Sequence, residues 1–370
     1  MTIFFVCGGT AGHVNPAIAI AEEFRCKYPN FKIVFIGADK ALEKKLVPEA
    51  GFDLININMT GLRRGFSPKD ILYNIKTAVK LVKASRESTK LLKNYKPNAV
   101  IGTGGYISYP VLKKASKRNI ATFVLEPNAH PGLAVKMLST IVDKIFVAYE
   151  GLESNFKKPE LVVYTGTPLR KKFFGVSDNK VNADKSRKLV VSYFGSLGAS
   201  KMNEMMADFI KLNVESNSFD HIHASGVSGG VEKFKALLTQ AGVSEVEPPI
   251  ADIREYIDNM SDVLSSADLV ICRAGASTIA ELAAIGKPAI LIPSPNPVIK
   301  QDVNAMQVCD AGGAKMIPEK DCTGEILFKT VSSLLADEKE LESMSANQKS
   351  LAVLNSASVI VDYIVQSNKS

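Results

Sequence analysis

Three glycine-containing stretches follow apolar runs and carry groups that could bind an anion. They are "GGTAGHVNPA" from residue 8, "GTGGYISYP" at 102–110 and "FGSLGASKMNE" at 194–204. Glycine lets the backbone approach a ligand closely, and the start of a following helix offers unpaired N–H groups at its positive end. One such stretch could be a tight turn, but three favour diphosphate binding. The expected loop glycines are Gly8, Gly9, Gly104, Gly105, Gly195 and Gly198.

Apolar runs rich in β-branched and aromatic residues alternate with helical stretches along the 370 residues. The runs that predict buried parallel strands are "TIFFV", "KIVFIG", "AVIGTGG", "ATFVLE" and "KIFVA", then "KLVVSYFGS", "HIHASG", "LVICRAG" and "PAILIPS". "TIAELAAIG" predicts a helix that ends at a glycine C-cap. This alternation predicts an α/β fold of two doubly wound, Rossmann-like domains, which meet near 164–173. Their strand-end loops would face a shared cleft.

Composition narrows the class of protein. Five scattered cysteines show no spacing typical of zinc or of a disulfide framework, so we expect a reducing cytosol and no structural metal. The N-terminus lacks the basic start of a signal peptide, and no apolar run is long enough to span a bilayer. The net charge of +7 is uneven, with +11 in residues 1–165 and −4 in 166–370. The first half therefore suits an anionic partner.

A nicotinamide dinucleotide is the first ligand to consider. Its fingerprint requires G-x-G-x-x-G and an acidic residue after the second strand. Asp39 is close to that acidic position, but the first loop instead has two adjacent glycines and places His13 where a small residue is needed. An oxidoreductase is therefore disfavoured, and a nucleotide-sugar enzyme is the better hypothesis.

The same stretches carry a resemblance. "GGTAGHVNPA", "GLRRGF", "GTGGYISYP", "EPNAHPGLA", "TGTPLR", "FGSLGASKMN", "YIDNMSDVLSSADLVICRAGASTIAEL", "GKPAILIPSP" and "KQDVNAM" occur in this order. Along nearly its whole length the chain resembles the MurG family of bacterial glycosyltransferases, within glycosyltransferase family 28. Four positions depart from the family pattern: Ala11, Phe194, Leu197 and Lys300.

The resemblance implies the GT-B fold, in which two Rossmann-like domains face a cleft. It implies inverting transfer of N-acetylglucosamine from UDP-GlcNAc to the C4 hydroxyl of undecaprenyl-diphosphate-MurNAc-pentapeptide (lipid I), which gives lipid II for peptidoglycan synthesis. Residues 1–165 would bind the acceptor and the membrane, and 166–345 would bind the donor. A C-terminal helix within 346–370 would pack back on the first domain.

On the acceptor side, the reaction needs a base for the attacking hydroxyl. His13 is the first candidate, because imidazole titrates near neutral pH; alternatively it could bind the acceptor diphosphate or only order its loop. Glu126 is a second candidate base, or else a structural hydrogen-bond acceptor. The resemblance implies that Thr10, Gly12 and Asn128 orient the acceptor, although Asn128 could instead cap a turn.

On the donor side, the resemblance implies that the carboxylate of Glu281 binds both ribose hydroxyls. The backbone of Ile257 would contact uracil, so its side chain should matter little. Ser196 would bind the diphosphate, with Arg170 and Arg273 as helpers, although Arg273 could equally be a structural ion-pair partner. Sugar recognition would fall to Gln301 and Asn304.

No Asp-x-Asp occurs in the sequence, so we expect no obligatory metal and no other cofactor. Three rival functions remain: a glycolipid transferase with a diacylglycerol acceptor, a UDP-sugar epimerase that needs no acceptor, and a non-catalytic UDP-sugar-binding protein. Transfer to lipid I in a glycosylation assay would separate the expected activity from all three.

Residues 63–96 hold ten Lys or Arg against two Asp or Glu, with apolar residues at helical spacing among them. An ordinary amphipathic helix with its apolar face in the core would explain part of this pattern. The charge also suits an anionic membrane surface, and no recognition motif supports nucleic acid. We expect a peripheral protein on the cytoplasmic face of the cell membrane. The resemblance adds cell-wall synthesis and division proteins as partners.

Overall fold

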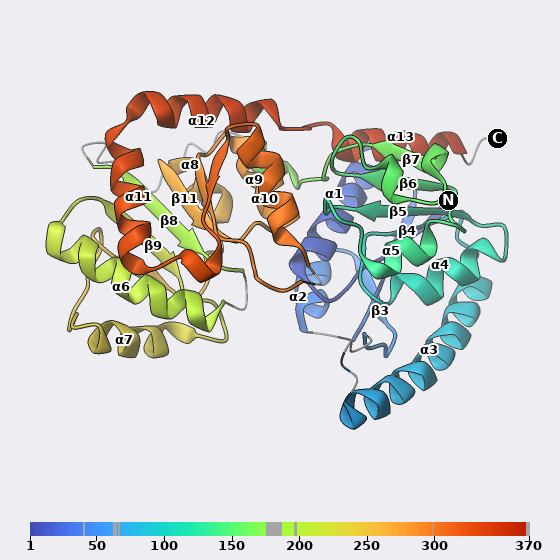
Figure 1. Ribbon diagram of the computed structural model, residues 1–370. Helices are drawn as coiled ribbons and strands as arrows, with labels where there is room; N and C mark the ends of the chain where they lie inside the picture. Colours follow the sequence, from blue (N-terminus) through green and yellow to red (C-terminus); the bar gives the residue numbers. More distant parts are fainter. Residues whose placement is uncertain are drawn as a thin grey trace. The chain divides into compact units, whose positions relative to one another are not determined.

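The computed structural model describes residues 1–39, 41–61, 65, 67–174, 187–195, 198–297 and 299–367. The chain forms two compact units (Figure 1). Unit 1 comprises Met1–Lys171 and Val353–Ser370, and unit 2 comprises Lys172–Ala352. The boundaries thus lie a few residues beyond those expected at 165 and 345, and "TGTPLR" belongs to unit 1.

Unit 1 is built on a parallel sheet in the order β3-β2-β1-β4-β5-β6-β7. Its strands are β1 (Thr2–Val6), β2 (Lys32–Gly37), β3 (Asp53–Asn56), β4 (Ala99–Gly102), β5 (Ala121–Glu126), β6 (Lys144–Val147) and β7 (Val162–Tyr164). All five strands expected in this half are confirmed. The edge strands β3 and β7 were not predicted; they are only four and three residues long.

Helices cover both faces of this sheet (Figure 1). They are α1 (Ala11–Lys27), α2 (Ala41–Glu49), α3 (Pro68–Tyr95), α4 (Ser108–Ser116), α5 (Leu133–Leu138) and α13 (Ser356–Ser367). Alternate residues of β1 point to opposite faces. Ile3 and Phe5 pack with α1 and α13, whereas Phe4 and Val6 pack with α3 and α4. The C-terminal helix α13 therefore completes the core of unit 1.

Unit 2 repeats the scheme with the sheet order β10-β9-β8-β11-β12-β13. Its strands are β8 (Leu189–Tyr193), β9 (Asp220–Ala224), β10 (Asp252–Arg254), β11 (Leu269–Cys272), β12 (Ala289–Leu291) and β13 (Ala314–Met316). All pairings are parallel. The expected fold of two doubly wound, Rossmann-like units is confirmed.

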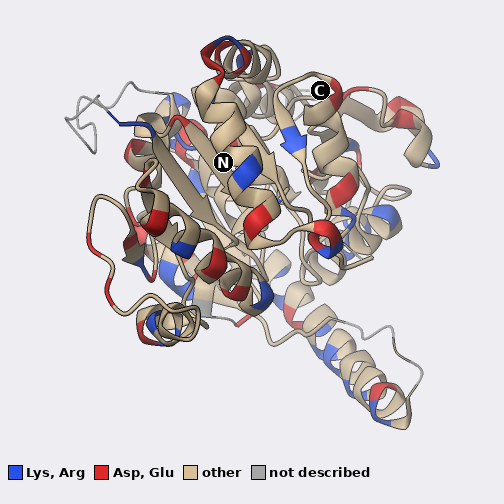
Figure 2. Ribbon diagram, turned by 60° about the vertical axis from the view of Figure 1, so that its left-hand side comes forward, with Lys and Arg blue, Asp and Glu red and all other residues tan. Residues whose placement is uncertain are grey.

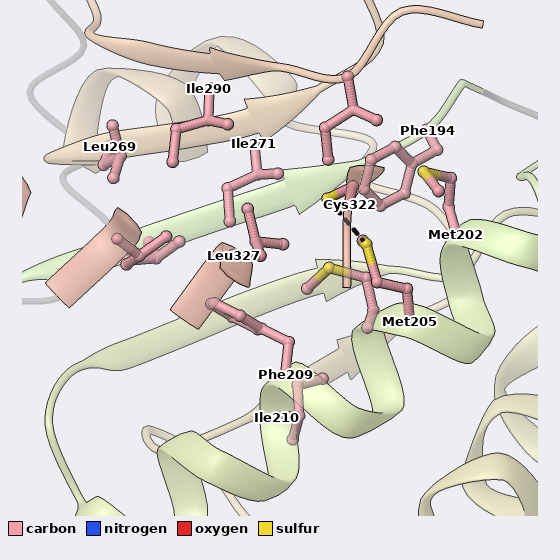
Figure 3. Packing of buried hydrophobic residues seen from close by; sticks show 14 of the residues in the cluster. Phe194, Met202, Met205, Phe209, Ile210, Leu269, Ile271, Ile290, Cys322 and Leu327 are labelled. Atoms are coloured by element: carbon pink, nitrogen blue, oxygen red, sulfur yellow. Dashed lines mark hydrogen bonds between the residues drawn. The ribbon is translucent and has the colours of Figure 1, made fainter. Parts of the chain in front are cut away.

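The helices of unit 2 are α6 (Ser200–Ser216), α7 (Gly230–Gln240), α8 (Met260–Ser266), α9 (Ala276–Ile285), α10 (Gln301–Asp310), α11 (Gly324–Ala336) and α12 (Glu338–Ser350). Figure 3 shows how α6 meets one face of the sheet, with Met205 and Phe209 beneath Ile271. Helix α9 is followed by Gly286, which has a φ of +67° and is the expected glycine C-cap.

Helix α3 is long and only partly buried. Ser67 caps it by accepting a hydrogen bond from the Asp70 N–H at 3.2 Å. Its apolar residues near the N-terminal end are all more than half exposed: Ile71, Leu72, Ile75, Val79 and Val82. The core alternative for this row is therefore wrong. In Figure 2 this part of α3 extends from unit 1 and carries blue lysines. Among the described helices, none has the length and apolarity needed to cross a bilayer.

Candidate functional site

The predicted acceptor motifs come together at one edge of the unit 1 sheet. Loops 7–10, 103–107 and 127–132 follow β1, β4 and β5, which are neighbours in the sheet. The chain leaves β1 toward β2 on one side and returns to β4 on the other. The first two loops therefore flank the topological switch point, where open α/β sheets bind their ligands.

The two glycine loops pack directly on each other. A Cβ on Gly105, whose φ is +81°, would collide with the carbonyl oxygen of Gly8, and a Cβ on Gly104 would collide with the His13 ring. Thr103 closes the contact, because its Oγ1 donates to the His13 carbonyl at 2.6 Å. Only glycine permits this close approach, so His13 lies next to the backbone of both glycine loops.

One hydrogen bond fixes the chemical state of the half-buried His13 ring. Nδ1 lies 3.2 Å from the Gly8 carbonyl oxygen and 3.3 Å from Thr10 Oγ1. A carbonyl only accepts, so Nδ1 must carry the proton in this contact, and Nε2 is left with a lone pair. Burial lowers the pKa of His13, although the Gly8 hydrogen bond opposes this shift. The ring is thus neutral near pH 7, with Nε2 able to accept a proton.

The start of α1 offers donors to an anion. Thr10 is the N-cap, and its side chain makes no capping hydrogen bond. Its carbonyl accepts from the N–H groups of His13 and Val14. Within the described part of the chain, the N–H groups of Ala11 and Gly12 have no acceptor. Such unpaired N–H groups at a helix N-terminus suit a phosphate, as predicted for this loop.

Glu126 and Asn128 organise the third loop. The Glu126 side chain is buried; its Oε1 accepts from Asn128 N at 3.0 Å and Nδ2 at 2.9 Å, and its Oε2 accepts from Gly132 N at 2.7 Å. Burial raises the pKa of Glu126, and these hydrogen bonds oppose the shift. Because both oxygens already accept hydrogen bonds, the geometry favours the structural alternative for Glu126 over its role as a base.

In unit 2, β8 and β11 flank the equivalent switch point. The loop after β8 includes Gly195 and Gly198, and Ser196 lies outside the described residues. A Cβ on Gly198, whose φ is +76°, would collide with the Ser225 carbonyl oxygen. Asn203 Nδ2 donates to that same oxygen at 2.9 Å. The third glycine loop is therefore held close to the loop after β9, just before α6 begins.

Both candidate arginines have structural partners. Arg170 lies in unit 1, where its Nε and Nη2 donate to Glu22 Oε1 at 3.1 and 2.8 Å. Arg273 Nη1 donates to the carbonyls of Ile292 and Pro293, and Nη2 pairs with Glu319 at 2.5 Å. For Arg273 the geometry supports the ion-pair alternative over a diphosphate contact.

The other donor-side candidates lie on or next to α9, α10 and β10. Glu281 is half-buried on α9, and its charge helps to raise the pKa of Cys272 above the ordinary range, after burial. Ile257 packs in the core, so only its backbone is available to a ligand. Gln301 Oε1 accepts from Ser294 N at 2.9 Å. Asn304 is fully buried and donates to the Ala274 carbonyl, which places it behind the loop after β11.

Three residues that hold these loops in place were not among the predicted site residues. Thr103 and Asn203 lie inside the quoted motifs, so their positions next to the glycines were a usable signal. Glu43 contacts the first glycine loop from α2, 34 residues along the chain. The sequence of α2, "ALEKKLVPE", is typical of an ordinary surface helix, so it did not indicate that Glu43 contacts the glycine loop.

Two family models match most of the chain. Residues 3–147 match the glycosyltransferase family 28 N-terminal domain, and 189–360 match its C-terminal domain. The chain is 38% identical over 369 residues to the UDP-N-acetylglucosamine--N-acetylmuramyl-(pentapeptide) pyrophosphoryl-undecaprenol N-acetylglucosamine transferase of Acetivibrio thermocellus, covering 98% of this chain and 97% of that relative.

Solved structures share the fold. The crystal structure of Acinetobacter baumannii MurG matches with a TM-score of 0.73 at 24% identity, over 99% of this chain and 100% of that one. The UDP-GlcNAc 2-epimerase of Neisseria meningitidis, bound to UDP-GlcNAc, matches with a TM-score of 0.67 at 14% identity, over 99% and 100% of the two chains. The fold alone therefore does not separate a transferase from an epimerase.

Proposed function

Because the chain belongs to glycosyltransferase family 28, we propose that it transfers N-acetylglucosamine from UDP-GlcNAc to the C4 hydroxyl of lipid I, which gives lipid II. The observation that carries this function is the near full-length match at 38% identity to a curated transferase with this substrate pair in its name. The glycine loops at both switch points agree with a diphosphate in each substrate.

In this reaction the acceptor hydroxyl oxygen attacks C1 of the donor sugar, and the C1–oxygen bond to UDP breaks. His13 Nε2 takes the hydroxyl proton. The Nδ1 contact with the Gly8 carbonyl supports this role, since it leaves the lone pair on Nε2. The acceptor diphosphate binds the N–H groups at the start of α1, with Thr10 and Asn128 beside it.

Unit 2 binds the donor. Glu281 accepts hydrogen bonds from the two ribose hydroxyls, and the Ile257 backbone contacts uracil. The UDP diphosphate binds the loop of Gly195 and Gly198, where the N-terminus of α6 favours negative charge. Gln301 contacts the sugar. The departing diphosphate is stabilised by backbone donors and the helix dipole without a metal, so chelation with EDTA should leave transfer unchanged.

The exposed row on α3 supports binding to a membrane surface. Its five apolar residues lie within one side of the helix, and α3 carries seven Lys or Arg against two Asp or Glu. A basic residue close to an anionic surface contributes about 1 kcal/mol, and the apolar side chains insert at the headgroups. We therefore propose a peripheral enzyme at the membrane surface, on its cytoplasmic face.

The test is transfer of radiolabelled GlcNAc from UDP-GlcNAc to a short-chain lipid I analogue, with UDP release measured with and without acceptor. Wild-type protein should form the labelled disaccharide lipid, and Glu281→Ala should lose it. Glu325→Ala, at an exposed position on α11, is the matched control and should retain activity. UDP-GlcNAc conversion without acceptor, turnover with diacylglycerol only, or UDP binding without product would each refute the proposal.

A further inference from the structure

Glu43 is a buried carboxylate behind the first glycine loop. It lies in the first turn of α2, its side chain is fully buried, and its Oε1 accepts a hydrogen bond from the Gly9 N–H at 2.7 Å. Among the described residues, its Oε2 has no hydrogen-bond partner, and no basic group forms an ion pair with the carboxylate. A buried charge with one neutral donor is costly. A glutamine could accept the same Gly9 N–H at lower desolvation cost, so the presence of a carboxyl group here needs an explanation.

The hydrogen bonds of Glu43 and His13 meet on one peptide group. The Gly9 N–H and the Gly8 carbonyl belong to the same planar amide, and a trans amide directs them to opposite sides. Glu43 accepts from the N–H, and His13 Nδ1–H donates to the oxygen at 3.2 Å. A Cβ on Gly8 would lie 2.5 Å from Glu43 Oε1, so glycine is needed for the carboxylate to reach the amide.

We propose that Glu43 is a positioning residue for the transfer reaction, which acts on His13 through the Gly8–Gly9 peptide group. The carboxylate polarises the amide, and its oxygen becomes a stronger acceptor for the Nδ1 proton. This fixes the ring orientation and the tautomer that exposes the Nε2 lone pair. The inference rests on the proposed function, in which His13 is the base.

The contacts from Glu43 through the peptide group to His13 would stabilise the positive charge that forms on the His13 ring during the reaction. As the acceptor oxygen bonds to C1 and UDP departs, the hydroxyl proton moves to Nε2 and the ring becomes an imidazolium. Its positive charge is then stabilised along the line from Nδ1–H through the amide to the carboxylate. A carboxylate in direct contact with histidine does the same in hydrolases; here a peptide group lies between them.

The other titratable groups near Glu43 and His13 do not supply the negative charge that would stabilise the imidazolium. Cys7 follows β1, and burial raises the pKa of its thiol far above neutral pH, with the nearby Glu43 adding to the shift. The thiol is therefore uncharged. Asp39 and Lys44 pair with each other at 2.6 Å and are about half exposed. Burial lowers the pKa of His13, and the hydrogen bond to the Gly8 carbonyl opposes that shift.

Glu43→Gln tests the charge, because the amide oxygen of glutamine can still accept from the Gly9 N–H. We expect kcat to fall on the order of tenfold with the KM for UDP-GlcNAc unchanged. The acidic limb of the pH–rate profile should move down by about half a pH unit, since loss of a nearby negative charge disfavours imidazolium. Glu49→Gln, an exposed position on the same helix, should change neither quantity. A Glu43→Gln profile that coincides with that of wild type would overturn the proposal.

NMR titration of wild-type protein is a second test that needs neither activity nor a folded variant. The Gly9 amide proton should resonate far downfield and should shift with the same midpoint as the His13 ring. A Gly9 amide that is indifferent to His13 protonation would refute the relay. If wild-type protein fails to transfer GlcNAc while this coupling is present, the proposed function fails and the relay stands.

Discussion

Acid should unfold unit 2, because two of its histidines are buried in the neutral state. His221 and His223 lie on β9 and have no solvent exposure. Ser192 Oγ lies 2.8 Å from His221 Nε2 and 2.7 Å from His223 Nδ1, so one hydroxyl bridges both rings. Burial lowers the pKa of His221 well below its ordinary value, with the neighbouring His223 adding to the effect. Burial also lowers the pKa of His223, to about 3.

The loss of stability at low pH is set by proton uptake of the two histidines in the unfolded chain. There both imidazoles take up protons below about pH 6.5, whereas the folded state binds none until far lower pH, so stability falls with pH. Between pH 8 and pH 5 each histidine should remove about 2 kcal/mol from the free energy of unfolding, or about 4 kcal/mol for the pair. That is a large share of the stability of an ordinary domain.

Hydrogen exchange of the β9 amides, read by mass spectrometry from pH 8 to pH 5, reports the opening free energy of unit 2 alone. The matched variant combines Ser192→Ala, His221→Leu and His223→Leu, which removes both titrating rings and the hydroxyl between them. Its pH dependence should be smaller than that of wild type by the amount above, whatever its absolute stability. If wild-type β9 loses under 1 kcal/mol over this range, or if the two histidines titrate near pH 6.5 by NMR, the reasoning fails.

Three further outcomes follow from contacts already described. Gly105→Ala forces a side chain onto a positive φ and into the first glycine loop, so it should destabilise unit 1 by about 2 kcal/mol or more and weaken acceptor use, measured as Tm and acceptor KM. Ile75→Asp combined with Val79→Asp should leave Tm unchanged, because both residues are exposed, yet should reduce co-sedimentation with anionic vesicles; unchanged sedimentation would contradict the role of α3. Arg273→Ala leaves Glu319 largely buried, with Lys201 as its remaining ion-pair partner among the described residues, and should cost about 3 kcal/mol. The loss should be visible as a lower Tm with UDP binding retained; an unchanged Tm would argue against the structural ion pair.

Features that depend on the local sequence pattern, such as the central strands and the glycine loops, could be predicted from the sequence. The central strands of both sheets were all identified, and most of them are apolar runs, although β9 ("DHIHA") carries two histidines. Edge strands such as β10 ("DIR") and β13 ("AKM") are too short and too polar to give a signal. The glycine loops were found because each combines a strand end with a helix start. Their conformation, however, depends on the approach of a second loop, as at Gly105 and Gly8.

Side-chain roles were harder to predict, because they are decided by neighbours distant in sequence. Arg273 pairs with Glu319, 46 residues later, and Asn304 reaches the Ala274 carbonyl, 30 residues earlier. No spacing rule reveals these contacts. For Ile257 only the backbone was expected to contact a ligand, and the burial of its side chain is consistent with that expectation.

The α3 row and the acceptor loops are parts of one structural unit. Unit 1 uses Thr77, Ala84, Ser88 and Leu92 to pack α3, so the exposed apolar row contributes nothing to its core. Helix α3 packs against α4, and α4 begins at Ser108, whose Oγ donates to the Gly104 carbonyl of the second glycine loop at 2.8 Å. The proposed acceptor is a lipid-linked diphosphate, and an enzyme that uses such an acceptor must hold its acceptor loops at the membrane surface. An apolar, basic helix joined through one neighbour to those loops meets this requirement, whereas a water-soluble acceptor would give no reason to expose the row.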